Sequence, residues 1–344
     1  MNLEALKVSF QDLLAERGCL LADGATGTNF FKCGLGAGDP PELWNIDHPE
    51  RVAELHRSFV EAGSDIILTN SFGGNAYRLK LHNAQDRVFE LNKAAAQIAR
   101  AEADMGERPV LVAGSMGPTG EIFEPVGTLS HEGGVAAFVA QAEGLKAGGV
   151  DLLWIETISS EEELRAAVEG ASSVGLPVVT TMSFDTNGRT MMGIAPEEFA
   201  NLAASLPQPP VAIGANCGTG ASELVATVLG ISGADPNAIV VAKANAGIPE
   251  FVEGEIQYSG TPDLMADYVR LARDAGARII GGCCGTTPEH LVAMRAALEA
   301  HVPGARPTIS DIEGGLGAVS ALAKGEGPVR AERVESGRRR RRRR

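Results

Sequence analysis

Eight short apolar runs, each followed by a segment of helical pattern, constrain the fold of this 344-residue chain more than any other feature. The runs are Cys19 to Ala22, Asp65 to Thr69, Val110 to Gly114, Asp151 to Ile155, Val178 to Ser183, Val211 to Ala215, Ile239 to Ala242 and Ala277 to Ile280. Continuous apolar strands that alternate with helices are typical of a parallel sheet buried on both faces. Eight such units predict an α/β fold, a single closed (β/α)8 barrel of the TIM type.

An open, doubly wound sheet is the alternative fold. Its usual mark is a Gly-x-Gly-x-x-Gly turn after the first strand. The segment Asp23 to Thr28 has glycines at the wrong spacing for that turn, so we favour the barrel. An initial helix over Leu3 to Leu14 has apolar residues on one side, and we expect it to close the bottom of the barrel.

The pattern decays beyond Pro303 into glycine-rich and charged sequence that ends in seven arginines, Arg338 to Arg344. Such a segment can bury too little apolar surface to offset its ordering entropy. We therefore expect the barrel to span residues 1–305 and residues 306–344 to form a disordered, arginine-rich tail.

Charge and composition exclude several functional classes. The net charge is −14 and would be −21 without the seven terminal arginines, so the body of the protein is not expected to bind nucleic acid. The chain contains no run of 18 uncharged apolar residues, so we predict no membrane span. The charged, helical N-terminus does not resemble a signal peptide. Together with only five cysteines, these features predict a cytoplasmic protein.

Three cysteines lie among glycines where predicted strands end: Cys217, and the adjacent pair Cys283 and Cys284. Three thiolates without histidine suit a soft cation such as Zn²⁺, and three protein ligands leave a fourth position for a substrate. We expect one zinc ion per chain. Cysteine is otherwise often a small buried hydrophobic residue. Cys19 and Cys33 do not lie among glycines at strand ends, and we interpret them as structural or incidental.

The carboxyl ends of barrel strands meet at one face, where active sites are built. The residues collected there are Asp23, Gly24, Thr69, Asn70, Gly114, Ser115, Glu156, Thr157, Asn216, Cys217, Asn245, Cys283 and Cys284. Two carboxylates beside a tri-thiolate metal site predict a pocket for a small zwitterion that contains sulfur. Its thiolate would take the open metal position, and its ammonium would meet Asp23 and Glu156.

Five motifs also resemble the homocysteine S-methyltransferase family. They are Asp23-Gly-Ala-Thr-Gly-Thr28, Leu68-Thr-Asn-Ser-Phe72, Gly114-Ser-Met-Gly-Pro118, Gly214-Ala-Asn-Cys217 and Gly281-Gly-Cys-Cys-Gly-Thr-Thr-Pro288. The amino-acid sequences of these motifs are most similar to those of the homocysteine module of cobalamin-dependent methionine synthase. Betaine-dependent methyltransferases are related. The resemblance implies a TIM barrel, and zinc held by Cys217, Cys283 and Cys284. It also implies homocysteine contacts at Asp23, Gly24 and Glu156, supported by Thr69, Asn70, Ser115 and Asn216.

This reading predicts a zinc-dependent enzyme that transfers a methyl group to the thiolate of homocysteine and forms methionine. The expected donor is methylcobalamin on a separate corrinoid protein, with a folate-binding subunit as a further partner. The alternative is a small onium donor such as betaine, S-methylmethionine or dimethylsulfoniopropionate. Two other classes stay open: a silent barrel that stores zinc or scaffolds other subunits, and an aldolase-type barrel that forms a Schiff base at Lys243.

Overall fold

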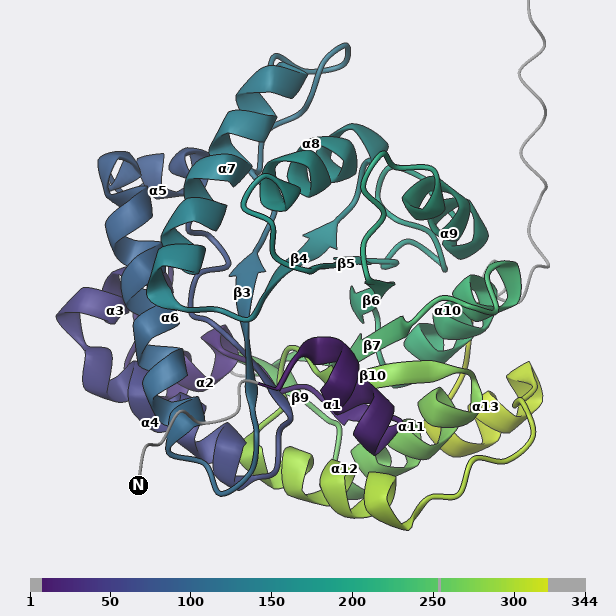
Figure 1. Ribbon diagram of the computed structural model, residues 1–344. Coiled ribbons are helices and arrows are strands. Elements are labelled where there is room, and N and C mark those ends of the chain that lie inside the picture. The colour runs from purple at the N-terminus through teal and green to yellow at the C-terminus, as the bar shows by residue number, and fades with distance from the viewer. Residues whose placement is uncertain (1–7, 253–254, 321–344) are drawn as a thin grey trace, which may run out of the picture.

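The computed structural model describes residues 8–252 and 255–320, and its strands form a parallel barrel (Figure 1). The barrel strands are β1 (Leu20–Leu21), β2 (Ile66–Leu68), β3 (Leu111–Met116), β4 (Leu152–Ile158), β5 (Val178–Met182), β6 (Ala212–Cys217), β7 (Val240–Ala244) and β10 (Ala277–Gly282). They lie in the order β1-β10-β7-β6-β5-β4-β3-β2. A parallel bridge between Ala22 and Ile66 joins the first strand to the second and closes the ring. The predicted (β/α)8 barrel is confirmed, and the open sheet is wrong.

Helices surround the strands, except for the first helix, which lies across one end of the barrel (Figure 1). They are α1 (Phe10–Arg17), α2 (Gly27–Lys32), α3 (Trp44–Asp47), α4 (Pro49–Glu61), α5 (Ala76–Lys80), α6 (Val88–Asp104), α7 (His131–Gly148), α8 (Glu161–Ser172), α9 (Pro196–Ala204), α10 (Ala221–Ala234), α11 (Pro262–Asp274), α12 (Pro288–Ala300) and α13 (Ile309–Leu316). An antiparallel hairpin, β8 (Pro249–Val252) with β9 (Glu255–Tyr258), separates β7 from α11. Within the described ranges, no helix is long and apolar enough to cross a membrane.

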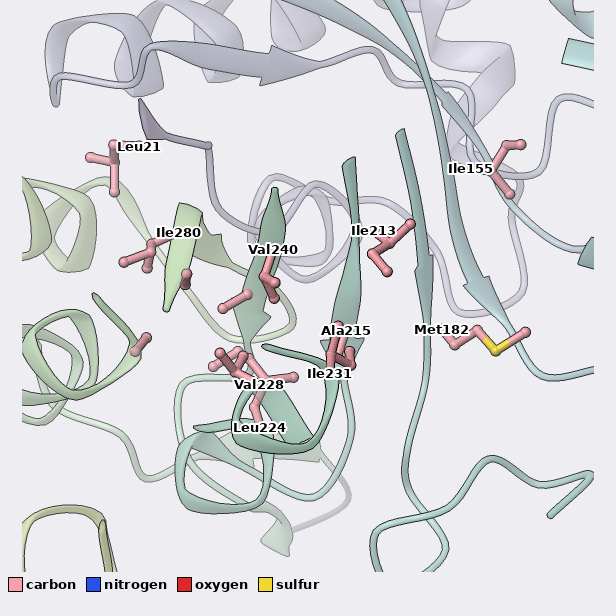
Figure 2. Packing of buried hydrophobic residues seen from close by; sticks show 14 of the residues in the cluster. Leu21, Ile155, Met182, Ile213, Ala215, Leu224, Val228, Ile231, Val240 and Ile280 are labelled. Atoms are coloured by element: carbon pink, nitrogen blue, oxygen red, sulfur yellow. The ribbon is translucent and has the colours of Figure 1, made fainter. Parts of the chain in front are cut away.

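The main core lies between the strands and the outer helices. Leu224, Val228 and Ile231 of α10 belong to the same buried cluster as Val240 of β7 and Ala215 of β6, and Figure 2 shows this packing. These side chains follow the i, i+4, i+7 spacing that places residues on one helix face. The apolar face of the helix therefore covers the outer surface of β6 and β7.

A second core fills the inside of the barrel, and α1 closes its lower end. Phe10, Leu13 and Leu14 are buried in one cluster with Leu20 and Trp154. The hydroxyl of Ser9 accepts a hydrogen bond from the Asp12 N–H (3.1 Å) and caps the helix. The predicted plugging helix is confirmed in place, and among the described residues it spans Phe10–Arg17. Residues 1–7 lie outside the described ones.

The expected disordered tail needs a correction between residues 306 and 320. Here α13 packs on α10 and α11, with Ile312 fully buried and Val319 nearly so. Ser222 Oγ donates to the carbonyl of Ala318 (3.0 Å), and the Ser320 N–H donates to Glu223 (2.6 Å). Ile309 and Leu316 pack against the same core, so apolar contacts hold this segment on the barrel. Arg338 to Arg344 lie outside the described residues.

Candidate metal centre and substrate pocket

The three predicted cysteines meet at the carboxyl face of the barrel. Cys217 ends β6, whereas Cys283 and Cys284 follow β10, and these two strands lie on either side of β7. All three sulfur atoms lie within 4.8 Å of one another. Cys217 Sγ is 2.8 Å from Cys283 Sγ and 4.0 Å from Cys284 Sγ. Sulfurs bound to one tetrahedral ion at about 2.3 Å would lie at a comparable separation.

The three thiols shift one another's pKa through their hydrogen bonds. Hydrogen bonds to the other two thiols, together with burial, raise the pKa of Cys217 well above its ordinary value. A hydrogen bond with Cys217 works to lower the pKa of Cys283, but its hydrogen bond to Cys284 and burial raise it to about 12. Hydrogen bonds from both neighbours lower the pKa of Cys284 to about 3. A divalent cation would replace the protons of these thiols, and a set of three sulfur donors fits Zn²⁺.

Two residues beside the metal centre adopt a left-handed backbone that side chains disfavour. Cys217 has φ of 58° and Thr157 has φ of 65°. Non-glycine residues in this region cost on the order of 1–3 kcal/mol each and persist only where their surroundings enforce them. Strain of this kind marks the turn that points the Cys217 sulfur at its partners.

Asn216 lies between these two strained residues and holds one of them. Its side-chain oxygen accepts hydrogen bonds from the Thr157 N–H (2.9 Å) and the Thr181 hydroxyl (2.6 Å). Its amide nitrogen donates to Thr157 Oγ1 (2.8 Å). Asn216 is fully buried and does not line the pocket, so the structure places it behind the site as a support.

A cavity of about 300 Å³ opens beside the three sulfurs. Five of the predicted substrate residues line it: Gly24, Thr69, Asn70, Ser115 and Glu156. Asp23 and Asn216 were predicted as well, but neither is part of the lining. Gly24 has to be glycine, because a Cβ there would lie 2.9 Å from both the Phe59 ring and Thr286 Oγ1.

Glu156 presents a buried carboxyl group to this cavity. Ser115 Oγ donates to Glu156 Oε1 (2.5 Å). Burial raises the pKa of Glu156 to about 7 against the opposing effect of Lys243, and the nearby Cys283 raises it further. A carboxyl group that titrates near neutral pH, in a pocket, is typical of a functional site. Its charge is available to a substrate cation.

Asp23 has a different partner from the one we expected. Its Oδ1 accepts from Lys243 Nζ (2.8 Å), and its Oδ2 accepts from the Leu68 N–H (2.7 Å). Both oxygens are therefore occupied inside the protein. Burial acts to lower the pKa of Lys243, but Asp23 and Glu156 outweigh it and raise the pKa. A lysine held as an ammonium ion is a poor Schiff-base nucleophile, which argues against the aldolase-type alternative.

Thr69 and Asn70 shape the pocket wall through their own hydrogen bonds. Thr69 Oγ1 accepts from the Ser115 N–H (3.0 Å) and shares a hydrogen bond with Ser71 Oγ (2.6 Å). The Asn70 amide donates to the Pro41 carbonyl (2.7 Å). These contacts hold the loop after β2 in place over the cavity.

Sequence reasoning missed three aromatic residues of the site. The Tyr258 hydroxyl hydrogen bonds to Cys284 and helps to lower the pKa of that thiol. Phe31 and Phe72 line the cavity while 53% and 37% exposed, which places both at its mouth. Only Phe72 lay in a motif we had singled out, and Phe31 and Tyr258 carried no signal in the sequence.

The homocysteine S-methyltransferase family model matches residues 20–298, a span that includes all three cysteines and every lining residue named above. This chain belongs to the homocysteine S-methyltransferase family. Its family motifs are those that the barrel brings to one face.

Known relatives of this homocysteine S-methyltransferase family member agree with the assignment. The chain is 31% identical over 303 residues to a methionine synthase of Mycobacterium tuberculosis, and this match covers 83% of the chain and 25% of the relative. The chain therefore spans about a quarter of the length of the curated relatives it matches. Among solved structures, the metallated form of the homocysteine methyltransferase MmuM from Escherichia coli is 26% identical, with a TM-score of 0.68 over 83% of this chain and 98% of that one.

Proposed function

We propose that the protein transfers a methyl group to the thiolate of homocysteine, held at a zinc ion bound by Cys217, Cys283 and Cys284, and so forms methionine. The observation that carries this proposal is the cluster of three sulfurs within 4.8 Å beside a cavity lined by Glu156. Zinc, when bound, keeps a substrate thiol deprotonated at neutral pH and so supplies the nucleophile.

The residues of the chain orient the substrate. Glu156 lies in the cavity as a partner for the substrate ammonium group, and Ser115 fixes its orientation. Asp23 acts on the charge of the pocket through Lys243 rather than by direct contact, since both of its oxygens are occupied. Holding both ends of the amino acid aligns its sulfur for attack on a methyl carbon, and such positioning is a large part of catalysis. An amino-acid cradle of this kind has no use in a zinc store or scaffold.

For the donor, we propose methylcobalamin carried by a separate corrinoid protein, with a folate-binding subunit to recharge it. The relatives named methionine synthase support this choice. A second donor class is favoured by Phe31 and Phe72 at the cavity mouth, because aromatic faces attract quaternary ammonium and sulfonium cations. That class includes betaine, S-methylmethionine and dimethylsulfoniopropionate. We place the activity in the cytoplasm, where thiols stay reduced.

The test is to supply zinc-loaded protein and homocysteine with each donor in turn and to measure methionine. We expect one donor to give turnover and Cys284→Ala to abolish it. Turnover with methylcobalamin alone would support the corrinoid partner, whereas turnover with a small onium compound would replace it. Absence of methionine with every donor, in protein that binds zinc and homocysteine, would contradict the proposed reaction.

A further inference from the structure

A second pocket, of about 530 Å³, lies at the opposite face of the barrel from the metal centre. Four arginines line it: Arg17, Arg108, Arg273 and Arg295. Arg17 ends α1 just before the first strand, Arg273 is in the last turn of α11 before β10, and Arg108 precedes β3. The amino ends of strands meet at this face, so the pocket shares no residue with the candidate active site.

The charges around this pocket do not balance. Asp65 is fully buried and is paired with both Arg17 and Arg295. Glu299 lies 3.8 Å from Arg295 and is largely exposed. A third carboxylate, Asp274, lies 2.8 Å from His301 of the lining, so the four guanidinium groups still outnumber the nearby carboxylates, on a protein whose net charge is −14.

Arg108 is the group that points to a ligand. Among the described residues its Nη2 is buried and has no hydrogen-bond partner. Burial lowers the pKa of Arg108, and repulsion from Arg295 lowers it further. A buried donor without a partner costs free energy unless something binds to it. Arginine forks match the oxygens of carboxylate and phosphate groups.

We propose that this pocket binds a small oxyanion, namely a phosphate group, through Arg108 and Arg273. Arg17 and Arg295 stay with Asp65 and form the pocket wall. This site is independent of the proposed methyl transfer, because it lies at the other end of the barrel.

The test compares wild-type protein with Arg108→Gln by calorimetric titration with inorganic phosphate, at constant ionic strength set with chloride. We expect wild-type protein to bind about one phosphate and Arg108→Gln to bind it roughly 10-fold more weakly or worse. Arg165→Gln, which removes an exposed arginine of α8, should bind like the wild type. A parallel titration with O-phosphoserine tells a free phosphate from a phosphate ester as the preferred ligand.

Thermal unfolding separates binding from a structural role. In chloride, Arg108→Gln should be at least as stable as the wild type, because it loses no hydrogen bond and relieves repulsion from Arg295. In millimolar phosphate only the wild type and Arg165→Gln should gain melting temperature, since ligands that bind the native state stabilise it. Equal gains in Arg108→Gln, or no phosphate binding by the wild type, would overturn the proposal.

Discussion

Lys243 Nζ donates a hydrogen bond to Asp23 Oδ1 at 2.8 Å, and both side chains are almost completely buried. The pair joins β7 to the end of β1 across the top of the barrel. Lys243 also lies 5.6 Å from the centroid of the Trp154 ring, which fills the interior below it. The pair is therefore part of the core as well as of the candidate site.

Removing one partner of this pair should cost more than removing both. Lys243→Met leaves the Asp23 carboxylate buried without a cation, and we expect the free energy of unfolding to fall by about 3–5 kcal/mol. The double variant Lys243→Met, Asp23→Asn should recover part of that loss. Urea unfolding of the four proteins in the cycle measures this. A double variant less stable than Lys243→Met would contradict the pairing.

Each of the three cysteines should be necessary for metal binding. Cys217→Ala, Cys283→Ala and Cys284→Ala each remove one of three soft ligands, and we expect zinc to be lost on dialysis in every case. The exposed Cys33 is a matched control, and Cys33→Ala should keep about one zinc per chain. Metal analysis together with far-ultraviolet circular dichroism checks that the barrel itself survives. Full zinc occupancy in any of the three variants would remove that residue from the site.

Glu156 should recognise the amino group of the substrate. Glu156→Gln keeps the shape of the side chain but removes its charge, so we expect homocysteine to bind about 10- to 100-fold more weakly to the zinc-loaded protein. A simple alkyl thiol, which lacks the ammonium group, should bind almost unchanged. Calorimetric titration with both ligands measures the difference. Equal losses for the two would assign Glu156 to the fold or the metal instead.

The same carboxyl group should make stability depend on pH. The pKa of Glu156 is raised from 4.5 to about 7, so between these values the native state holds a proton that the unfolded state has lost. Stability from this group therefore falls as pH rises through that window, by about 3 kcal/mol in all. Glu156→Gln lacks this loss, and its advantage over the wild type should grow from pH 4.5 to 7 and then level off. Denaturant unfolding across this range checks the trend, and a difference that does not change with pH would contradict it.

The segment from 306 to 320 should contribute to the barrel's stability. Ile312→Ala removes a fully buried side chain that packs against α10 and α11, and we expect a loss of about 2–4 kcal/mol. Ile309, which is only partly buried, is a matched control with a smaller expected loss. Unfolding by urea measures both. If Ile312→Ala left the free energy of unfolding unchanged, the contact of α13 with the barrel would not stabilise the protein. The boundary predicted at residue 305 would then stand.

The sequence predicted the strands well because a strand buried on both faces reads as a continuous apolar run. The three cysteines were also within reach, since barrel topology brings strand ends together whatever their separation in the chain. The pairing of Lys243 with Asp23 could not be predicted, because the two residues lie far apart in the sequence and no local pattern specifies the contact. Likewise α13 was missed because it is held by packing of Ile312 against α10 and α11, and no local pattern specifies these partners. Local patterns therefore predicted the strands and the cysteine ligands, but not the partners of Asp23, Lys243 and Ile312.

The spacing of the metal ligands along the chain sets an order for assembly. Cys217 ends β6, but the other two sulfurs follow β10, the strand that also pairs with β1 to close the ring. A growing chain on the ribosome therefore offers one of three ligands until nearly the whole barrel has been made. A single thiolate holds zinc poorly, so loading of the ion belongs after ring closure. During synthesis the apolar strands alone have to guide the barrel to its final form.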